Sequence, residues 1–344
     1  MSFNRLVADD FVVSSDSITA GLWTDNQTPT ITTFFTSSTQ AGGSSGNYYL
    51  NVFQNAATSS LEFAVNYGNQ AGSGSIAYNL DVDGKSPTST IYGQYRTLVL
   101  GDENSSFAFG GITSSDFWTI SVERSRYKES LLPGSTTLLL ANGGNTISLT
   151  DNSQVVNSVV FNDAGRVFQL VSGSAGNVVN TTSIGGNTNG YSADSGSYGW
   201  FLPDIATYIL NPRALSNSFA KGGIGLAATL TSATSSTTNP NPNKIFVAIK
   251  SGASFTANSQ ETISSDFVFV RPRSSEFNYS ENPSFISGST GEVIYPLFIN
   301  SPTTYITTVG LYNDTNELLA VAKLSKPLQK DFTKEALIRV KLDF

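Results

Sequence analysis

Apolar and polar residues alternate over many short runs of this chain, which is the two-residue period of half-buried β-strands. The clearest run is EALIRVKLDF at residues 335–344, in which every second residue from Ala336 to Phe344 is apolar and the residues between them are mostly charged. The end of a chain usually frays unless it is tied into a sheet. We therefore expect this last segment to be a strand that pairs with a neighbour.

Runs of the same kind recur along the chain, rich in aromatic or β-branched residues and bounded by Gly, Asn, Asp or Ser. They lie at 47–54 (NYYLNVFQ), 61–68 (LEFAVNYG), 96–101 (RTLVLG), 116–123 (DFWTISVE), 158–163 (SVVFND) and 166–173 (RVFQLVSG). The short NDAG at 162–165 predicts a hairpin. Helical periodicity is almost absent, and only 203–223 is expected to hold one or two short turns, because Pro212 would break a longer helix. The pattern predicts an all-β fold of antiparallel sandwich or barrel-type domains.

One low-complexity segment, TLTSATSSTTNPNPN at 229–243, indicates a linker or an exposed loop. Residues 1–228 would then form an N-terminal β-rich body, either as one domain or as two subdomains split near residue 130. Residues 244–344 would form a C-terminal β domain, with strands at 244–250 (KIFVAIK) and 266–273 (DFVFVRPR). Its last part, from residue 303 to the end, predicts a three-stranded antiparallel meander in which the terminal strand pairs with ELLAVAKL at 317–324.

The composition favours a folded chain that associates with other chains. Charged residues make up only 13% of the 344 residues, against about 25% in typical soluble domains. The 22 Phe, 14 Tyr and 3 Trp supply enough apolar bulk for a core, so disorder is not expected. Surfaces with little charge favour association. The net charge of −7 argues against a nucleic-acid partner, which requires a basic face.

Targeting signals are missing from the sequence. The start, MSFNRLVADD, lacks the pattern of a signal peptide, and no apolar run approaches the 18 residues that a membrane helix needs. We therefore expect no membrane insertion and a protein made in a cytoplasm.

The sequence excludes most kinds of catalytic and metal site. The chain has no His and no Cys, so Ser–His–Asp triads and zinc sites of the usual kind cannot form, and no metal or cofactor is expected. The segment DVDGK at 81–85 begins like a calcium loop, but Lys85 and Tyr92 occupy positions that need carboxylates. A pair of carboxylates for glycoside cleavage is the one catalytic option left, because it needs only Asp or Glu. The acidic residues are scattered, and we expect no enzyme.

Two basic groups stand out. Arg124, Arg126 and Lys128 alternate, which places them on one face of a predicted strand, and Arg339 and Lys341 share the outer face of the terminal strand. One interpretation is a solvated edge that Lys and Arg protect against pairing. The other is a surface that docks onto an acidic neighbour. The candidate interface residues are Arg124, Arg126, Lys128, Arg339, Lys341 and Phe344.

Several long segments resemble one family of proteins. They are residues 47–54, 86–111 (SPTSTIYGQYRTLVLGDENSSFAFGG), 120–135, 159–176, 196–216 and 267–344, of which the last is the most specific. Together they are similar to virion structural proteins of contractile-tailed phages, the myoviruses, that infect marine cyanobacteria. The resemblance covers nearly the whole chain and brings no catalytic residues with it.

The resemblance implies a component of the virion, assembled in the host cytoplasm. Its partners would be other virion proteins and copies of itself. We expect a structural subunit of the tail or baseplate that assembles through β-edge pairing and packing of strand faces. The alternatives are a receptor-binding adhesin or fibre that recognises host surface polysaccharide, and a capsid decoration or neck protein.

Overall fold

The computed structural model describes residues 4–23, 33–36, 49–54, 60–74, 86–179, 190–191, 194–230, 240–280 and 282–343. The chain forms two compact units: a body unit, Ile18–Glu261, and a terminal unit, Met1–Ser17 together with Thr262–Phe344. This division differs from the one expected from the sequence. The first residues join the C-terminal segment because strand β1 (Phe11–Gly21) pairs with β17 (Asn258–Val270), and each of these strands has residues in both units.

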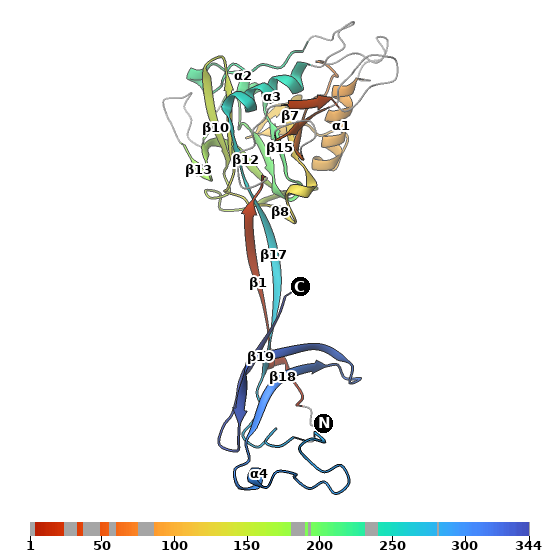
Figure 1. The fold of residues 1–344 in the computed structure, drawn as a ribbon. Helices are drawn as coiled ribbons and strands as arrows, with labels where there is room; N and C mark the ends of the chain where they lie inside the picture. Colours follow the sequence, from red (N-terminus) through yellow and green to blue (C-terminus); the bar gives the residue numbers. More distant parts are fainter. Residues whose placement is uncertain are drawn as a thin grey trace. The chain divides into compact units, whose positions relative to one another are not determined.

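The body unit is built on one large antiparallel sheet (Figure 1). Its strands, in spatial order, are β16 (Ser254–Thr256), β9 (Thr137–Asn142), β10 (Asn145–Asp151), β12 (Gly165–Ser174), β14 (Gly199–Leu202), β15 (Thr207–Leu210), β7 (Asp116–Val122), β4 (Leu61–Asn69), β3 (Tyr49–Phe53) and β2 (Thr33–Thr36). Strands β11 (Val160–Asn162) and β13 (Asn177–Val178) pair with β12. The predicted runs at β3, β4, β7, β11 and β12 are confirmed, as is the hairpin at NDAG, where Asn162 lies opposite Gly165.

The remaining elements of the body unit are short. They are β5 (Phe107–Phe109), β6 (Ile112–Ser114), β8 (Ser130–Leu131), α2 (Pro212–Ser216), and the 3₁₀ turns η3 (Arg124–Arg126), η4 (Pro203–Ile205) and η5 (Phe219–Lys221). In 203–223, where one or two short turns were expected, the structure has three short helical elements, η4, α2 and η5, with strand β15 between η4 and α2.

The sheet of the body unit curls into a partly closed barrel. Adjacent strands lie about 4.8 Å apart, so in a flat sheet β16 and β15, five steps apart, would be separated by about 24 Å. Yet the ring of Phe255 on β16 lies 5.4 Å from the ring of Tyr208 on β15 and 5.5 Å from that of Phe63 on β4. Only a strongly curved sheet brings these rings together, which agrees with the predicted all-β sandwich or barrel class.

Helix α3 (Pro240–Gly252) covers the inner face of this sheet and packs on β9. The strand predicted at 244–250 is therefore wrong. Ile245, Phe246, Ala248 and Ile249 are buried whereas Val247 is exposed, which is the spacing of one helix face. The predicted linker at 229–243 overlaps the start of this helix, and its central residues 231–239 lie outside the described residues.

Helix α1 (Pro87–Leu100) covers the outer face, and the strand predicted at 96–101 is wrong as well. The Ser86 hydroxyl accepts a hydrogen bond from the Ser89 amide while the Ser89 hydroxyl accepts one from the Ser86 amide, a reciprocal cap of the first turn. Pro87 occupies the first helical position and Gly101 ends the helix with φ of 70°. These local signals fix both ends of the helix.

Strands β7, β12, β14 and β15 contribute side chains to two different cores, one on each face of the sheet. On β7, Trp118 and Ile120 point into the large inner core, whereas Phe117 points to the outer core under α1. There Tyr92 of α1 stacks on Phe117 with ring centroids 5.3 Å apart. In these strands, alternation of side chains therefore places buried residues on both faces of the sheet. No helix in the described part of the chain is long and apolar enough to cross a membrane.

The terminal unit contains the second half of β17, β18 (Thr304–Tyr312), β19 (Leu318–Lys330), β20 (Ile338–Asp343), α4 (Pro296–Asn300) and η1 (Ala8–Asp10). Strands β18 and β19 form the expected hairpin. The last strand of the predicted meander is placed wrongly, because β20 pairs with β17 and not with β19. In this register Val340 lies opposite Val268 and Ile338 opposite Val270, so the pairing buries apolar side chains on one face. Within the described residues, β20 is an edge strand of its sheet.

A buried lysine ties a loop of the terminal unit to the end of β19. The Lys330 side chain is fully buried, and its Nζ donates to Ser274 O at 3.0 Å, Asn278 Oδ1 at 2.9 Å and Asp331 O at 3.0 Å. An ammonium group has three N–H donors, so all of them are satisfied. Asn278 in turn donates through Nδ2 to Ser274 O. The lysine therefore fixes the segment that follows β17.

Candidate functional site

The first predicted basic group does not form a strand face. Arg124 and Arg126 lie in the 3₁₀ turn η3, so the alternation that suggested a common face does not apply. The Arg124 guanidinium donates to the carbonyls of Tyr127 and Lys128 and lies 4.6 Å from the centre of the Tyr127 ring. This arginine folds back on its own turn.

The other two cations of that group are held by carboxylates of the body unit. Arg126 Nε lies 3.2 Å from the carboxylate of Glu62, which is completely buried, and also donates to Leu61 O. Lys128 Nζ lies 2.9 Å from Glu261 Oε2, in an exposed ion pair. Arg126 therefore neutralises a buried charge, and the three cations do not present a shared docking surface.

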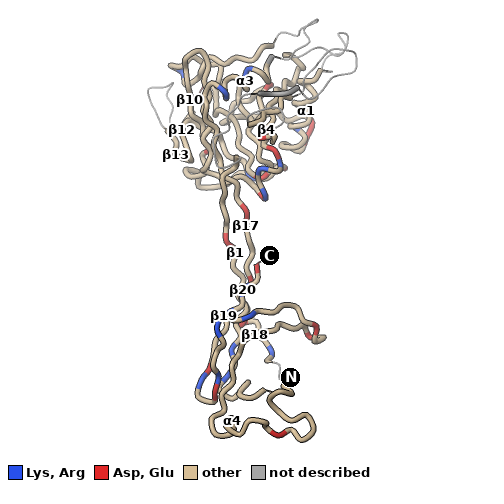
Figure 2. The backbone as a smooth tube through the Cα atoms, viewed as in Figure 1, with Lys and Arg blue, Asp and Glu red and all other residues tan. Residues whose placement is uncertain are grey.

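The second predicted group does share a surface. Arg339 and Lys341 are both exposed on the outer face of β20, as expected. Figure 2 colours the basic and acidic residues along the backbone of the chain. The Arg339 guanidinium lies 5.2 Å from the ring centre of Phe267 on the neighbouring strand, and Lys341 forms an ion pair with Asp343 at 2.9 Å. Phe344, the last of the candidate interface residues, lies outside the described residues.

The core of the terminal unit is small. Its buried members are Val268, Ile338 and Val340, and the inner face of the hairpin is only partly buried against them. A small core limits what hydrophobic burial can contribute to the stability of a unit standing alone. By contrast, the inner core of the body unit draws residues from most of its strands.

Large apolar side chains are exposed on the opposite, outer face of the β18–β19 hairpin. Tyr312 lies opposite Leu318, and Gly310 lies opposite Val321, so their side chains share this face. They are 40%, 53% and 58% exposed for Tyr312, Leu318 and Val321. A Cβ on Gly310 would meet the Tyr312 ring at 2.9 Å, which shows that the ring covers the glycine. We call Tyr312, Leu318 and Val321 the hairpin face.

The terminal unit has further exposed apolar surface. Leu297 and Ile299 on helix α4 are 82% and 69% exposed. A groove of about 660 Å³ runs along β18, with Leu6, Phe11 and Ile306 among its lining residues. Exposed apolar side chains concentrated in this way mark surfaces that other molecules cover.

The buried carboxylates of the body unit have structural partners. Tyr67 Oη donates to Asp116 Oδ2 at 2.8 Å, and burial raises the pKa of both groups. Asp151 accepts two hydrogen bonds from the Gly134 amide, both at 2.9 Å, and burial raises its pKa. Among the described residues, no group of three acidic side chains is placed to hold a metal ion. These acids tie turns and strand ends together.

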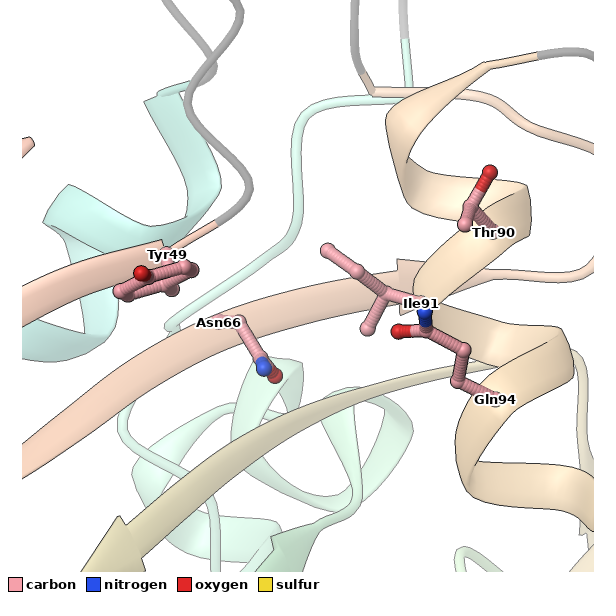
Figure 3. A pocket seen from close by; sticks show the side chains of 5 residues that line it. All are labelled: Tyr49, Asn66, Thr90, Ile91 and Gln94. Carbon is pink, nitrogen blue, oxygen red and sulfur yellow. The ribbon is translucent and has the colours of Figure 1, made fainter. Parts of the chain in front are cut away.

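A small cavity lined by several polar side chains lies on the outer face of the body unit, between the sheet and α1. Its volume is about 300 Å³, and its lining residues are Tyr49, Asn66, Thr90, Ile91 and Gln94. Figure 3 shows Tyr49 and Asn66 on strands at one side and the three α1 residues at the other. The sequence prediction missed this site because it placed no helix at 86–101, and the S-P-x-S start with Gly101 at the end was the signal that could have found it.

Comparisons of the chain with protein-family models, with curated proteins and with solved structures each found no match.

Proposed function

We propose that this chain is a non-enzymatic structural subunit of a tailed-phage virion, located in the tail or baseplate. Its segments resemble virion proteins of cyanobacterial myoviruses, and its partners are copies of itself and other virion proteins, met during assembly in the host cytoplasm. The absence of a catalytic role is part of the proposal. This part is supported by the carboxylates of Glu62, Asp116 and Asp151. Their partners are the Arg126 guanidinium, the Tyr67 hydroxyl and the backbone amide of Gly134.

The observation that carries this proposal is the contrast within the terminal unit. Among its described residues three make up the buried apolar core, while the hairpin face and helix α4 expose large apolar side chains. A unit of this kind gains apolar burial when a neighbour covers it. Strand faces and the edge of β20 supply the geometry, since an exposed edge offers main-chain hydrogen bonds to an added strand.

Measuring self-association of the chain tests this proposal directly, and substitutions on the hairpin face should weaken that association. Leu318 and Val321 are about half exposed, so covering both contributes roughly 2 kcal/mol of apolar burial. We expect the full chain to self-associate in sedimentation experiments, and the double variant Leu318→Lys/Val321→Lys to raise the dissociation constant by at least about tenfold.

Val155 offers a matched control, because it is 60% exposed on the body unit. Val155→Lys adds one positive charge at an exposed apolar position, as each of the two hairpin substitutions does, and should leave association unchanged. A wild-type chain that sediments as a monomer at every concentration would contradict assembly through this face. So would equal association of the wild type and the double variant.

A further inference from the structure

The cavity of the body unit gathers polar side chains from three elements. Tyr49 on β3 lies directly opposite Asn66 on β4, and Asn66 lies opposite Thr119 on β7, so the three side chains share the outer face of the sheet. Helix α1 packs on β4, and Thr90 and Gln94 lie four residues apart on one of its faces. The fold therefore places an aromatic ring, two carboxamides and a hydroxyl around one space (Figure 3).

Several polar atoms at this cavity have capacity for a ligand. The Asn66 side-chain oxygen accepts a hydrogen bond from the Thr119 hydroxyl, which orients the carboxamide and leaves its Nδ2 donor. Within the described residues, neither the Gln94 carboxamide nor the Tyr49 hydroxyl forms a hydrogen bond. A primary carboxamide both donates and accepts, and so does a hydroxyl. The cavity can therefore satisfy ligand groups that are donor and acceptor at once.

Among the residues that the structure describes, none of those lining the cavity is charged, which limits the class of ligand. A phosphate or carboxylate ligand would need a cation or a cluster of backbone amides to replace its hydration. A purely apolar ligand would leave four of the five lining side chains, all except Ile91, with their polar atoms desolvated. A neutral molecule rich in hydroxyl groups fits both restrictions.

We propose that this cavity binds a neutral saccharide. A pyranose ring presents an apolar C–H face that can pack against the Tyr49 ring, while its hydroxyls meet Asn66, Gln94 and Thr90. The volume of about 300 Å³ suits a terminal sugar residue, and it lies at the lower end of the range of roughly 300–1,000 Å³ for small-molecule sites. Ile91 is buried at the base of the cavity and supplies an apolar floor.

This proposal is independent of the assembly role, because the cavity belongs to the body unit and the hairpin face to the terminal unit. A subunit with such a site would also serve the polysaccharide-recognising alternative expected from the sequence. If no sugar binds, the proposal of self-association still stands. If the chain does not self-associate, the proposal of a sugar site still stands.

The test is binding of neutral sugars to the full chain, measured by saturation-transfer NMR and calorimetry. The probes are glucose, galactose, mannose and maltotriose, with glucuronic acid as the charged comparison. A sugar that packs on one aromatic ring and forms a few hydrogen bonds is expected to have a dissociation constant in the millimolar range. We expect at least one neutral probe to saturate the protein and glucuronic acid to bind more weakly than the neutral sugars.

The variants separate this site from binding elsewhere. Tyr49→Ala and Gln94→Ala should each weaken binding about tenfold, whereas Tyr49→Phe should keep most of it, because the ring remains. Gln94 is exposed, so its replacement leaves the fold intact even if Tyr49→Ala does not. Thr97→Ala on the same helix and Tyr305→Ala, an exposed tyrosine of the terminal unit, are the matched controls and should bind as the wild type does.

Three results would overturn the proposal. The first is the absence of saturable binding by every neutral probe at tens of millimolar. The second is wild-type affinity in both Tyr49→Ala and Gln94→Ala, which would place the binding elsewhere. The third is preferential binding of glucuronic acid, which would require a cation that the described lining residues do not supply.

Discussion

Replacing Lys330 by methionine would remove the clamp that holds the loop after β17 while keeping the length of the side chain. The ammonium group satisfies three acceptors, Ser274 O, Asn278 Oδ1 and Asp331 O. A buried acceptor left without a partner costs about 1–3 kcal/mol. Two effects offset part of this cost. Methionine carries no charge, so the folded variant avoids the cost of burying an ammonium group. Water can also reach the half-buried Ser274 and Asp331. We therefore expect a net loss of about 3 kcal/mol in the terminal unit.

Hydrogen exchange followed by mass spectrometry measures this loss locally. A loss of about 3 kcal/mol corresponds to roughly hundredfold faster exchange of amides in 274–280, if exchange follows local opening. Lys326→Met, at an exposed lysine of the same strand, is the matched control and should exchange as the wild type does. Asn278→Ala removes one partner of the clamp and should produce a smaller acceleration. Unchanged protection of 274–280 in Lys330→Met would refute the clamp.

Three further changes test the packing of the body unit. Arg126→Met should cost about 3–5 kcal/mol, read from urea unfolding, because it removes the charged partner of the buried Glu62 carboxylate. An equal cost in Lys128→Met, whose ion pair is exposed, would contradict this. Ser86→Ala removes the cap of α1 and should lower the unfolding midpoint of the unit by about 2–4 °C for a loss of about 1 kcal/mol; an unchanged midpoint would speak against the cap. Asp204→Asn should destabilise the chain most near neutral pH and progressively less below about pH 4, and a cost independent of pH would contradict that.

The sign of the Asp204 prediction follows from its contacts. Burial acts to raise the pKa of this carboxyl, but hydrogen bonds from Arg166, one of them at 2.6 Å, and the charge of that guanidinium outweigh burial and lower the pKa below its ordinary value. A carboxyl with a lowered folded pKa stabilises the fold above its unfolded pKa, and the contribution is lost as pH falls through the folded pKa. The asparagine variant lacks this titration, so its difference from the wild type shrinks in acid.

The sequence predicted the strands well where one face is apolar and the ends are marked by turn residues. The run at 61–68 is an example, because Phe63, Val65 and Tyr67 alternate toward the inner core. The sequence wrongly predicted a strand where residues common in β-strands lie inside a capped helix. The RTLVL segment of α1 contains Thr, Leu and Val, yet the signals at Ser86 and Gly101 decide its structure. Local caps outweighed residue preference there.

Tertiary partners account for the other differences. The KIFVAIK segment becomes a helix because its buried residues pack across the curved sheet, and the curvature depends on pairings far apart in the chain. Strand β20 takes β17 as its partner, although β19 is nearer in sequence, because Val268 and Val270 offer apolar positions that match Ile338 and Val340. Likewise, Arg126 could not be assigned to Glu62 before the fold placed the two side chains together.

Electron cryomicroscopy of particles of a phage whose genome encodes this chain tests the central proposal most directly. The account predicts density for the chain in the tail or baseplate, with a neighbouring subunit covering the hairpin face formed by Tyr312, Leu318 and Val321. Density confined to the capsid or neck would contradict the tail assignment. A particle without the chain, or a terminal unit whose apolar face stays open to solvent, would contradict the structural role itself.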